Sequence, residues 1–225
     1  SAGQSITLIG VGGPMNYGSR DGVTSSHLVI GKSTQEIEND DGTTTAMELT
    51  QAIVTVGVNS GITMNGQKLE SGGLAILGAS GPSPRELGIM STGLDFFETD
   101  ILANASDKAT IVGIGDSGSS YNNGILFNFS SLTAQGPVIL SGTAADTTEN
   151  QNNGILIEGS TIRSLWRGEE GPGISLTGTS GTGLDNNIGV IVSNSSLISR
   201  SPISIRGRSQ GRGEGNNGIE ILSLI

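Results

Sequence analysis

One phrase that returns four times in the second half of the chain limits most strongly what the chain can fold into. The phrase is Asn-Asn followed by Gly and Ile, and its third copy reads Asn-Asn-Ile-Gly. When the Gly of each copy is the marker, the copies are 30, 35 and 29 residues apart. Sequence that repeats at such a period predicts a stack of equivalent structural units. The four copies begin at Asn122, Asn152, Asn186 and Asn216.

Each unit contains three short apolar runs that alternate with polar residues and are bounded by Gly, Asn, Ser and Pro. Alternation of this kind over four to six residues predicts strands, and no segment of helical length carries a 3.6-residue stripe. We expect even the Leu- and Phe-rich segment 93–105 to form strands with a loop. The sequence therefore predicts an all-β fold: a right-handed parallel β-helix (β-solenoid) of about seven coils with three short strands per coil. Right-handed coiling is the default for parallel crossovers.

We expect a single domain over residues 1–225, with irregular coils over 1–120 and regular repeats of about 30 residues over 121–225. In the irregular half, apolar residues at i and i+2 with Gly at i+4 indicate the third strand of a coil, and looser runs indicate first strands. A five-residue insertion around 165–170 explains the one long step of 35 residues. The third strands are expected at Ile6, Ile62, Leu74 and Ala109, and the first strands at Ala46 and Gly88.

The composition agrees with a coil that turns three corners. Gly occupies 37 of 225 positions and aromatic residues only 3%, and both Gly and Asn accept the backbone conformations of tight corners. Equivalent residues of successive coils would lie about 4.8 Å apart, so side-chain amides can bond along a ladder. The predicted amide ladder is Asn123, Asn153, Asn187 and Asn217. The predicted aliphatic rows are Ile125, Ile155, Val190 and Ile219; Val138, Ile174 and Ile203; and Leu140, Leu176 and Ile205.

The phrases Asn-Asn-Gly-Ile, Ser-x-Ile and Ile-x-Leu-x-Gly also resemble a known family. They are similar to the β-helical passenger regions of large bacterial exoproteins of the filamentous haemagglutinin type, particularly the repeat arrays of cyanobacterial surface proteins. The resemblance covers residues 121–225 well and the first half loosely. It implies an extracellular or outer-cell-surface protein that serves as a stalk, adhesin or filament. The chain shows no recognisable secretion domain of such proteins, and it fits a segment of a longer protein.

Charge and residue types exclude several function classes. A net charge of −10 and a pI near 4.4 disfavour nucleic acid and anionic membrane surfaces as partners, and no apolar stretch is long enough to span a bilayer. The absence of Cys excludes disulfides and thiolate chemistry. Because His27 is the only histidine, a His-dependent triad or a multi-His metal site is excluded. We expect no metal and no cofactor.

Parallel β-helices also carry polysaccharide lyases and hydrolases, which need paired carboxylates with a basic partner. Most carboxylates here fall in predicted turns, where solvation explains them, and Asp95, Glu98 and Asp100 lack a neighbouring His or Arg-x-Lys phrase. The sequence therefore predicts a protein that is not an enzyme.

The inserted segment is the one feature that the repeat does not explain. It holds the sole Trp together with charged residues, a mixture suited to sugar stacking or protein contact. The alternative interpretation is a decorated loop whose Trp covers the outer sheet. The candidate ligand-binding residues are Trp166, Arg167, Glu169 and Glu170, and they support a second functional hypothesis, a carbohydrate-active enzyme or glycan-binding module.

The last segment of the sequence is apolar and lacks the polar cap expected over an end coil. An open solenoid end presents unpaired N–H and C=O groups to any similar edge. We therefore expect self-association end to end through an assembly edge formed by Ile221, Leu222, Leu224 and Ile225. The leading hypothesis is a non-enzymatic extracellular solenoid that acts as a rigid stalk, adhesin segment or filament subunit, with a glycan or cell-surface ligand as a further partner.

Overall fold

The computed structural model contains strands and no helix in the residues that it describes, as the alternation predicted. Most of the first half is described only as separate strands, whereas the second half is nearly continuous. The described residues are 6–11, 26–29, 33–38, 44–49, 53–56, 62–65, 68–71, 74–79, 92–103, 108–115, 122–146, 150–168 and 170–224.

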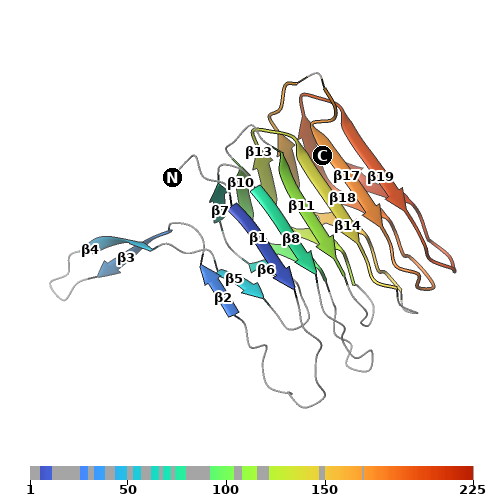
Figure 1. Ribbon diagram of the computed structural model, residues 1–225, viewed down its shortest axis with the longest axis horizontal. Helices are drawn as coiled ribbons and strands as arrows, with labels where there is room; N and C mark the ends of the chain where they lie inside the picture. The colour runs from blue at the N-terminus through green and yellow to red at the C-terminus, as the bar shows by residue number, and fades with distance from the viewer. Residues whose placement is uncertain are drawn as a thin grey trace, which may run out of the picture.

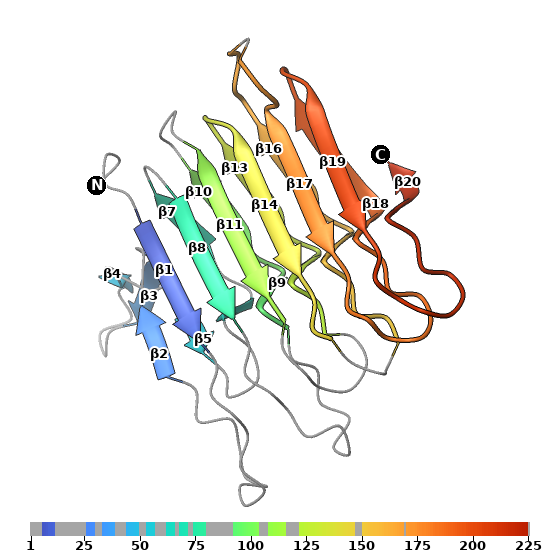
Figure 2. The same ribbon diagram turned by 45° about the vertical axis from the view of Figure 1, so that its right-hand side comes forward.

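Six parallel strands lie side by side in one sheet, called sheet 1 here (Figure 1). Figure 2 shows them in sequence from blue at the N-terminal end to red at the C-terminal end. Neighbouring strands belong to successive coils, so sheet 1 grows along the solenoid axis. In order across the sheet they are β1 (Ile6–Val11), β8 (Leu74–Ala79), β11 (Ala109–Ile114), β14 (Val138–Thr143), β17 (Ile174–Thr179) and β19 (Ile203–Arg208).

The remaining parallel strands form two further faces, and the ten-residue strand β18 (Val190–Ser199) joins them. Its first part pairs with sheet 2 and its last part with sheet 3. Besides this strand, sheet 2 contains β6 (Ile62–Asn65), β9 (Leu94–Phe97), β12 (Ile125–Asn128), β15 (Ile155–Glu158) and β20 (Ile219–Leu224). Sheet 3 contains β7 (Lys68–Ser71), β10 (Asp100–Ala103), β13 (Ser131–Ala134) and β16 (Thr161–Ser164).

The parallel sheets form a β-solenoid of about four turns, fewer than the seven expected. The strands from β9 to β19 build these turns, and β6, β7 and β8 pair in parallel with the first of them. The segment 93–105 contributes β9 and β10, so its prediction as strands with a loop is confirmed.

The N-terminal strands explain the smaller number of turns, because several of them pair antiparallel. The strands β3 (Ser33–Glu38) and β4 (Thr44–Leu49) form a separate two-stranded ribbon, while β2 (Ser26–Val29) and β5 (Ile53–Val56) extend sheet 2 antiparallel from β6. The first strand expected at Ala46 is therefore wrong, since it lies in β4, and the one expected at Gly88 is outside the described residues.

The glycine-marked third strands are confirmed except at Ile62. The strands that begin at Ile6, Leu74 and Ala109 all lie in sheet 1, in the register that aligns their glycines. Ile62 pairs with Leu94 and therefore belongs to sheet 2. The alternation fits either face, and only the pairing decides between them.

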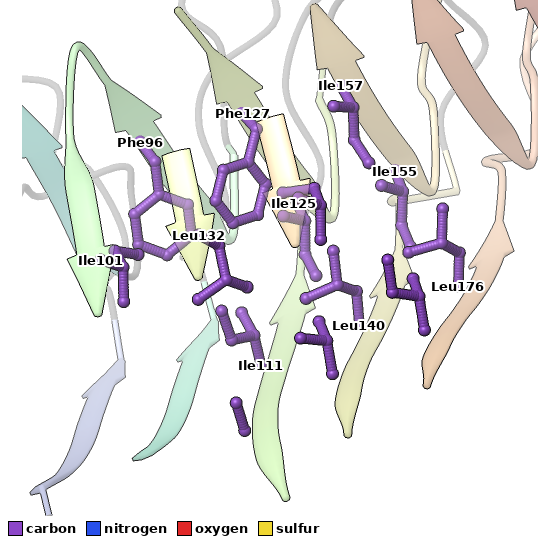
Figure 3. Packing of buried hydrophobic residues seen from close by; sticks show 14 of the residues in the cluster. Phe96, Ile101, Ile111, Ile125, Phe127, Leu132, Leu140, Ile155, Ile157 and Leu176 are labelled. Carbon is purple, nitrogen blue, oxygen red and sulfur yellow. The ribbon is translucent and has the colours of Figure 1, made fainter. Parts of the chain in front are cut away.

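Aliphatic rows fill the interior as predicted, except that the last members of two rows, Ile203 and Ile219, are exposed. Ile125 pairs with Ile155, and Val190 with Ile219; Val138 and Leu140 pair with Ile174 and Leu176. Two phenylalanines break the aliphatic pattern: the rings of Phe96 and Phe127 stack with centroids 4.6 Å apart (Figure 3). Since the inward side chains of the inner coils are fully buried, the core is one thin column that runs through the stack. The inward residues of the four central coils are Leu94, Phe96, Ile101, Ala103, Ala109, Ile111, Ile125, Phe127, Leu132, Ala134, Val138, Leu140, Ile155, Ile157, Ile162, Ile174, Leu176, Val190 and Val192.

A row of glycines stacks along sheet 1 where it meets the next corner. Gly113 pairs with Gly142, and Gly142 with Gly178. A Cβ on Gly178 would overlap the carbonyl oxygen of Gly189 at the start of the next coil. These positions therefore require Gly because one backbone segment passes directly over another.

Candidate functional site

Buried asparagines at the corner before sheet 2 bond from coil to coil. The side-chain oxygen of Asn152 accepts hydrogen bonds from the backbone N–H and the amide of Asn122, at 3.1 and 2.9 Å. Asn152 donates in the same way to Asn187, which donates to Asn216. This amide row thus joins four successive coils, and Asn122 and Asn152 are completely buried within it.

A second row lies one residue further along the chain, and it corrects the predicted ladder. Asn153 donates to the side-chain oxygen of Asn123 at 3.2 Å, and the next member is Ile188, whose N–H donates to Asn153. The predicted ladder is therefore right in pairing Asn123 with Asn153 and wrong in its third member, Asn187. Ile188 separates the third asparagine pair from Gly189, so both asparagines lie one position earlier relative to the glycine register. Asn217 is exposed, and its amide donates to Glu220 instead.

The corner between sheets 2 and 3 carries a hydroxyl row that the sequence interpretation missed. In each step a backbone N–H donates to the hydroxyl oxygen of the equivalent residue in the next coil, at 2.9 to 3.0 Å. The donor and acceptor pairs are Thr99 to Ser130, Ser130 to Ser160, and Ser160 to Ser195. The signal for this row is a Ser or Thr two residues after the end of β9, β12 and β15, and at the equivalent position within β18. Among so many serines, only the register separates these buried ones from exposed ones.

Residues at the same corner adopt a left-handed backbone conformation. The φ angles are 47° at Glu98, 49° at Phe129, 56° at Gly159 and 45° at Asn194, each the residue before a member of the hydroxyl row. Because Cβ atoms crowd this conformation, the corner is held by the bonds of the hydroxyl row rather than by glycine alone.

The predicted binding loop is the connection between β16 and β17. It comprises residues 165–173, nine residues against three in the turns before β14 and β19. The extra length is one residue more than the predicted insertion, because Gly173 lies between Pro172 and β17. Neighbouring coils hold the loop in place: the N–H of Leu165 donates to Ala134 at 2.8 Å, and the Ser201 hydroxyl donates to the Gly168 carbonyl at 3.0 Å.

The candidate residues of this loop differ in accessibility. Trp166 is half-buried, and the edge of its ring that carries Nε1 packs against Gly168. Its Nε1 is buried with no hydrogen-bond partner among the described residues. Arg167 and Glu170 are exposed, whereas Glu169 lies outside the described residues. The indole thus packs against its own loop on one side, while Arg167 and Glu170 face solvent.

The predicted assembly edge lies on β20, which pairs with β18 alone in the described part of the chain. Ile221 and Leu222 are each 50% exposed, whereas Val192 of the preceding coil is fully buried. Leu224 pairs with Ser195, and Ile225 is outside the described residues. Ile221 therefore occupies a position that the inner coils bury, whereas Leu222 lies at the outward position that Glu158 and Ser193 occupy in the preceding coils.

Asp95 stands out among the described carboxylates by its shifted pKa; it lies half-buried on β9, next to Leu126 in the register. Burial raises the pKa of the Asp95 carboxyl from its ordinary 3.8 to about 6. Glu98 and Asp100, its neighbours in the sequence, are both exposed. Its position inside the Leu-Asp-Phe run of β9 is the signal that separates it from Glu98, which lies in the corner, and from Asp100, which begins β10.

Asp95→Asn is expected to stabilise the chain at neutral pH and not at pH 4. The folded chain holds the Asp95 proton more tightly than the unfolded chain, so the free energy of unfolding falls as pH rises from about 4 to about 6. The free energy of unfolding of the variant does not fall in this pH range. At pH 7 it therefore exceeds that of the native chain by about 1 to 2 kcal/mol, after allowance for partial solvent exposure. Urea denaturation at pH 4, 5, 6 and 7.5 measures it. Asp146→Asn, at an exposed position, is the control; a gain that is constant with pH would contradict the assignment.

No helix in the described part of the chain is long and apolar enough to cross a membrane. No three His, Cys, Asp or Glu side chains in this part gather closely enough to hold a metal ion.

Comparison of the chain with protein-family models, curated proteins and solved structures gave no match. The resemblance to haemagglutinin-type exoproteins therefore stays a prediction that depends on the repeat phrases.

Proposed function

We propose that the chain is a non-enzymatic structural protein of the cell surface, a right-handed β-solenoid that acts as a rigid stalk, adhesin segment or filament subunit. The observation that carries this proposal is the use of the polar corner residues. Asn152 and Asn187 bond to equivalent residues of neighbouring coils, and so do Ser160 and Ser195. Buried polar networks that are fully bonded make a structure rigid, which suits a protein that presents loops at a distance.

The test is an assay for cleavage of polysaccharides by the purified chain. We expect no new reducing ends and no unsaturated uronate from a panel of neutral, uronate-containing and sulfated polysaccharides. Product release by the native chain, and not by chain unfolded beforehand, would overturn the structural role. It would support the alternative, a carbohydrate-active enzyme or glycan-binding module, in which Trp166, Arg167, Glu169 and Glu170 contact sugar.

Self-association through the β20 edge is part of the proposal, and the fold limits its form. At the opposite end of sheet 2, β5 and β2 pair antiparallel, so among the described strands a second copy meets a continuing parallel edge of this sheet only at β20. A joint between two such edges closes a dimer with two-fold symmetry, whereas a filament needs unlike surfaces. Sedimentation velocity over a range of concentrations distinguishes these forms. Dimers or longer polymers support association, and a monomer at every concentration contradicts it.

A further inference from the structure

Sheet 1 differs in charge from the rest of the chain. Its six strands contain none of the 21 Asp and Glu residues, and its only charged residues are Arg206 and Arg208 on β19. The strands of sheets 2 and 3, in contrast, carry Asp95, Asp100 and Glu158. In a chain of net charge −10, one face is thus free of the negative charge that would repel an anion.

The outward residues of β14, β17 and β19 form rows across the coils that are polar except for Ile139, which lies beside Ser175. The inward residues of β17, such as Leu176, are buried, and the residues between them face outward. Thr143, Thr177 and both arginines of β19 are exposed. The first row is Ser141, Thr177 and Arg206, the second row is Thr143, Thr179 and Arg208, and Ser175 lies beside Ser204.

The two guanidinium groups stand beside hydroxyls and have no acidic residue as a register neighbour. Arg206 lies next to Thr177, and Arg208 next to Thr179. Arg200 and Arg212 flank β19 and are also exposed, so four of the 11 basic residues of the chain fall within 200–212. The acidic groups near Arg212 are Glu214, in the loop that follows β19, and Asp185, whose carboxylate accepts from the N–H of Glu214 at 2.8 Å; neither lies on a strand of sheet 1. The C-terminal part of sheet 1 is therefore a local cationic surface on an acidic protein.

We propose that this outer face of β14, β17 and β19 binds an anionic polysaccharide that bears carboxylate or sulfate groups. Guanidinium forks pair with such groups through two parallel hydrogen bonds. The Ser and Thr side chains of these outer polar rows, spaced by about 4.8 Å from strand to strand, supply donors and acceptors for sugar hydroxyls. The proposal rests on the proposed function, since it names the ligand class of a surface-exposed solenoid. The negative charge elsewhere confines a polyanion to this face.

The experiment measures binding of the chain to immobilised polygalacturonate, dextran sulfate and neutral dextran. We expect binding to at least one of the two anionic polymers at low salt, and its loss in 1 M NaCl, where the Debye length is about 3 Å. The anionic polymer that binds more tightly identifies carboxylate or sulfate as the recognised group. Equal binding to neutral dextran, or no binding to either anionic polymer, would overturn the proposal.

The double variant R206E/R208E locates the site. We expect its affinity to fall about tenfold or more, as the loss of a charge-assisted pair implies. The control is R163E/R167E, which makes the same change in net charge at two exposed arginines on β16 and in the Trp166 loop. We expect the affinity of this control to change less than twofold. An equal loss in both variants indicates a general charge effect, and a larger loss in the control indicates the Trp166 loop; either result contradicts the proposal.

The experiments distinguish failure of the polysaccharide-binding proposal from failure of the proposed structural role. Because all four arginines are exposed, we expect both double variants to fold. A cooperative thermal unfolding transition of each variant checks this. A folded chain that binds no anionic polysaccharide and cleaves none keeps the structural role and loses this site. A chain that cleaves polysaccharide loses the structural role, whichever face binds.

Discussion

Gly178→Ala is expected to lower the free energy of unfolding by about 3 kcal/mol, a large part of the stability of an ordinary domain. The added methyl group would overlap the carbonyl oxygen of Gly189 and approach a methyl group of Val190. The first of these contacts is with backbone, which cannot rotate away. Since Gly142 and Gly207 pair with Gly178 on either side, a shift of β17 would also disturb its neighbours in sheet 1.

Urea denaturation of the variant measures this cost, and Gly171→Ala is its matched control. Gly171 has a positive φ of 86° and no atom within 4 Å of an added Cβ. Its substitution therefore reports the conformational cost of the left-handed region alone, about 1 to 2 kcal/mol. Equal costs for the two variants would show that close approach of the coils does not require Gly178.

Asn152→Ala is the second change with a large expected effect, a loss of about 3 kcal/mol. The truncation removes the acceptor for the N–H and amide of Asn122, and the amide that donates to Asn187. Both partners are buried without access to water, so their polar groups lose bonds that solvent cannot replace.

Asn217→Ala is the control for this second variant. Asn217 belongs to the last asparagine pair but is exposed, and its amide bonds to the side chain of Glu220. We expect a change within about 0.5 kcal/mol, typical of exposed positions. Chemical denaturation of both variants at one pH gives the comparison, and a small effect of Asn152→Ala would mean that the amide row adds little to stability.

The repeat predicted the fold because it records the same physical demand in every coil. Gly142, Gly178 and Gly207 occupy equivalent positions since backbone crosses backbone at that corner, and Ile125, Ile155 and Val190 fill the same narrow core. The number of turns was not predictable in this way. Period-two alternation is the same in parallel and antiparallel strands, so the sequence around Ala46 and Ile62 did not reveal their pairing.

The details of the sites depend on the register between strands, which the order of residues in the repeat does not determine. Asn187 was assigned to the wrong row because Ile188 shifts the asparagine pair by one residue. The lack of acidic residues on sheet 1 was not predictable, because its six strands are far apart in the sequence. Only the sheet order brings Arg206 and Arg208 next to the hydroxyls of β17. The loop around Trp166 was found from sequence since an insertion interrupts the repeat itself.

The amide and hydroxyl rows join residues 29 to 35 positions apart, so each coil interacts mainly with the coil before it and the coil after it. The molecule therefore behaves as a one-dimensional lattice, in which stability is a sum of coil terms and nearest-neighbour couplings. In such a lattice an inner coil opens only when two couplings break, whereas within the described part of the chain the coil that contains β20 is held by one coupling, that of β20 to β18. Local opening is then graded along the axis, and any molecule that covers the β20 edge protects the coils behind it as well.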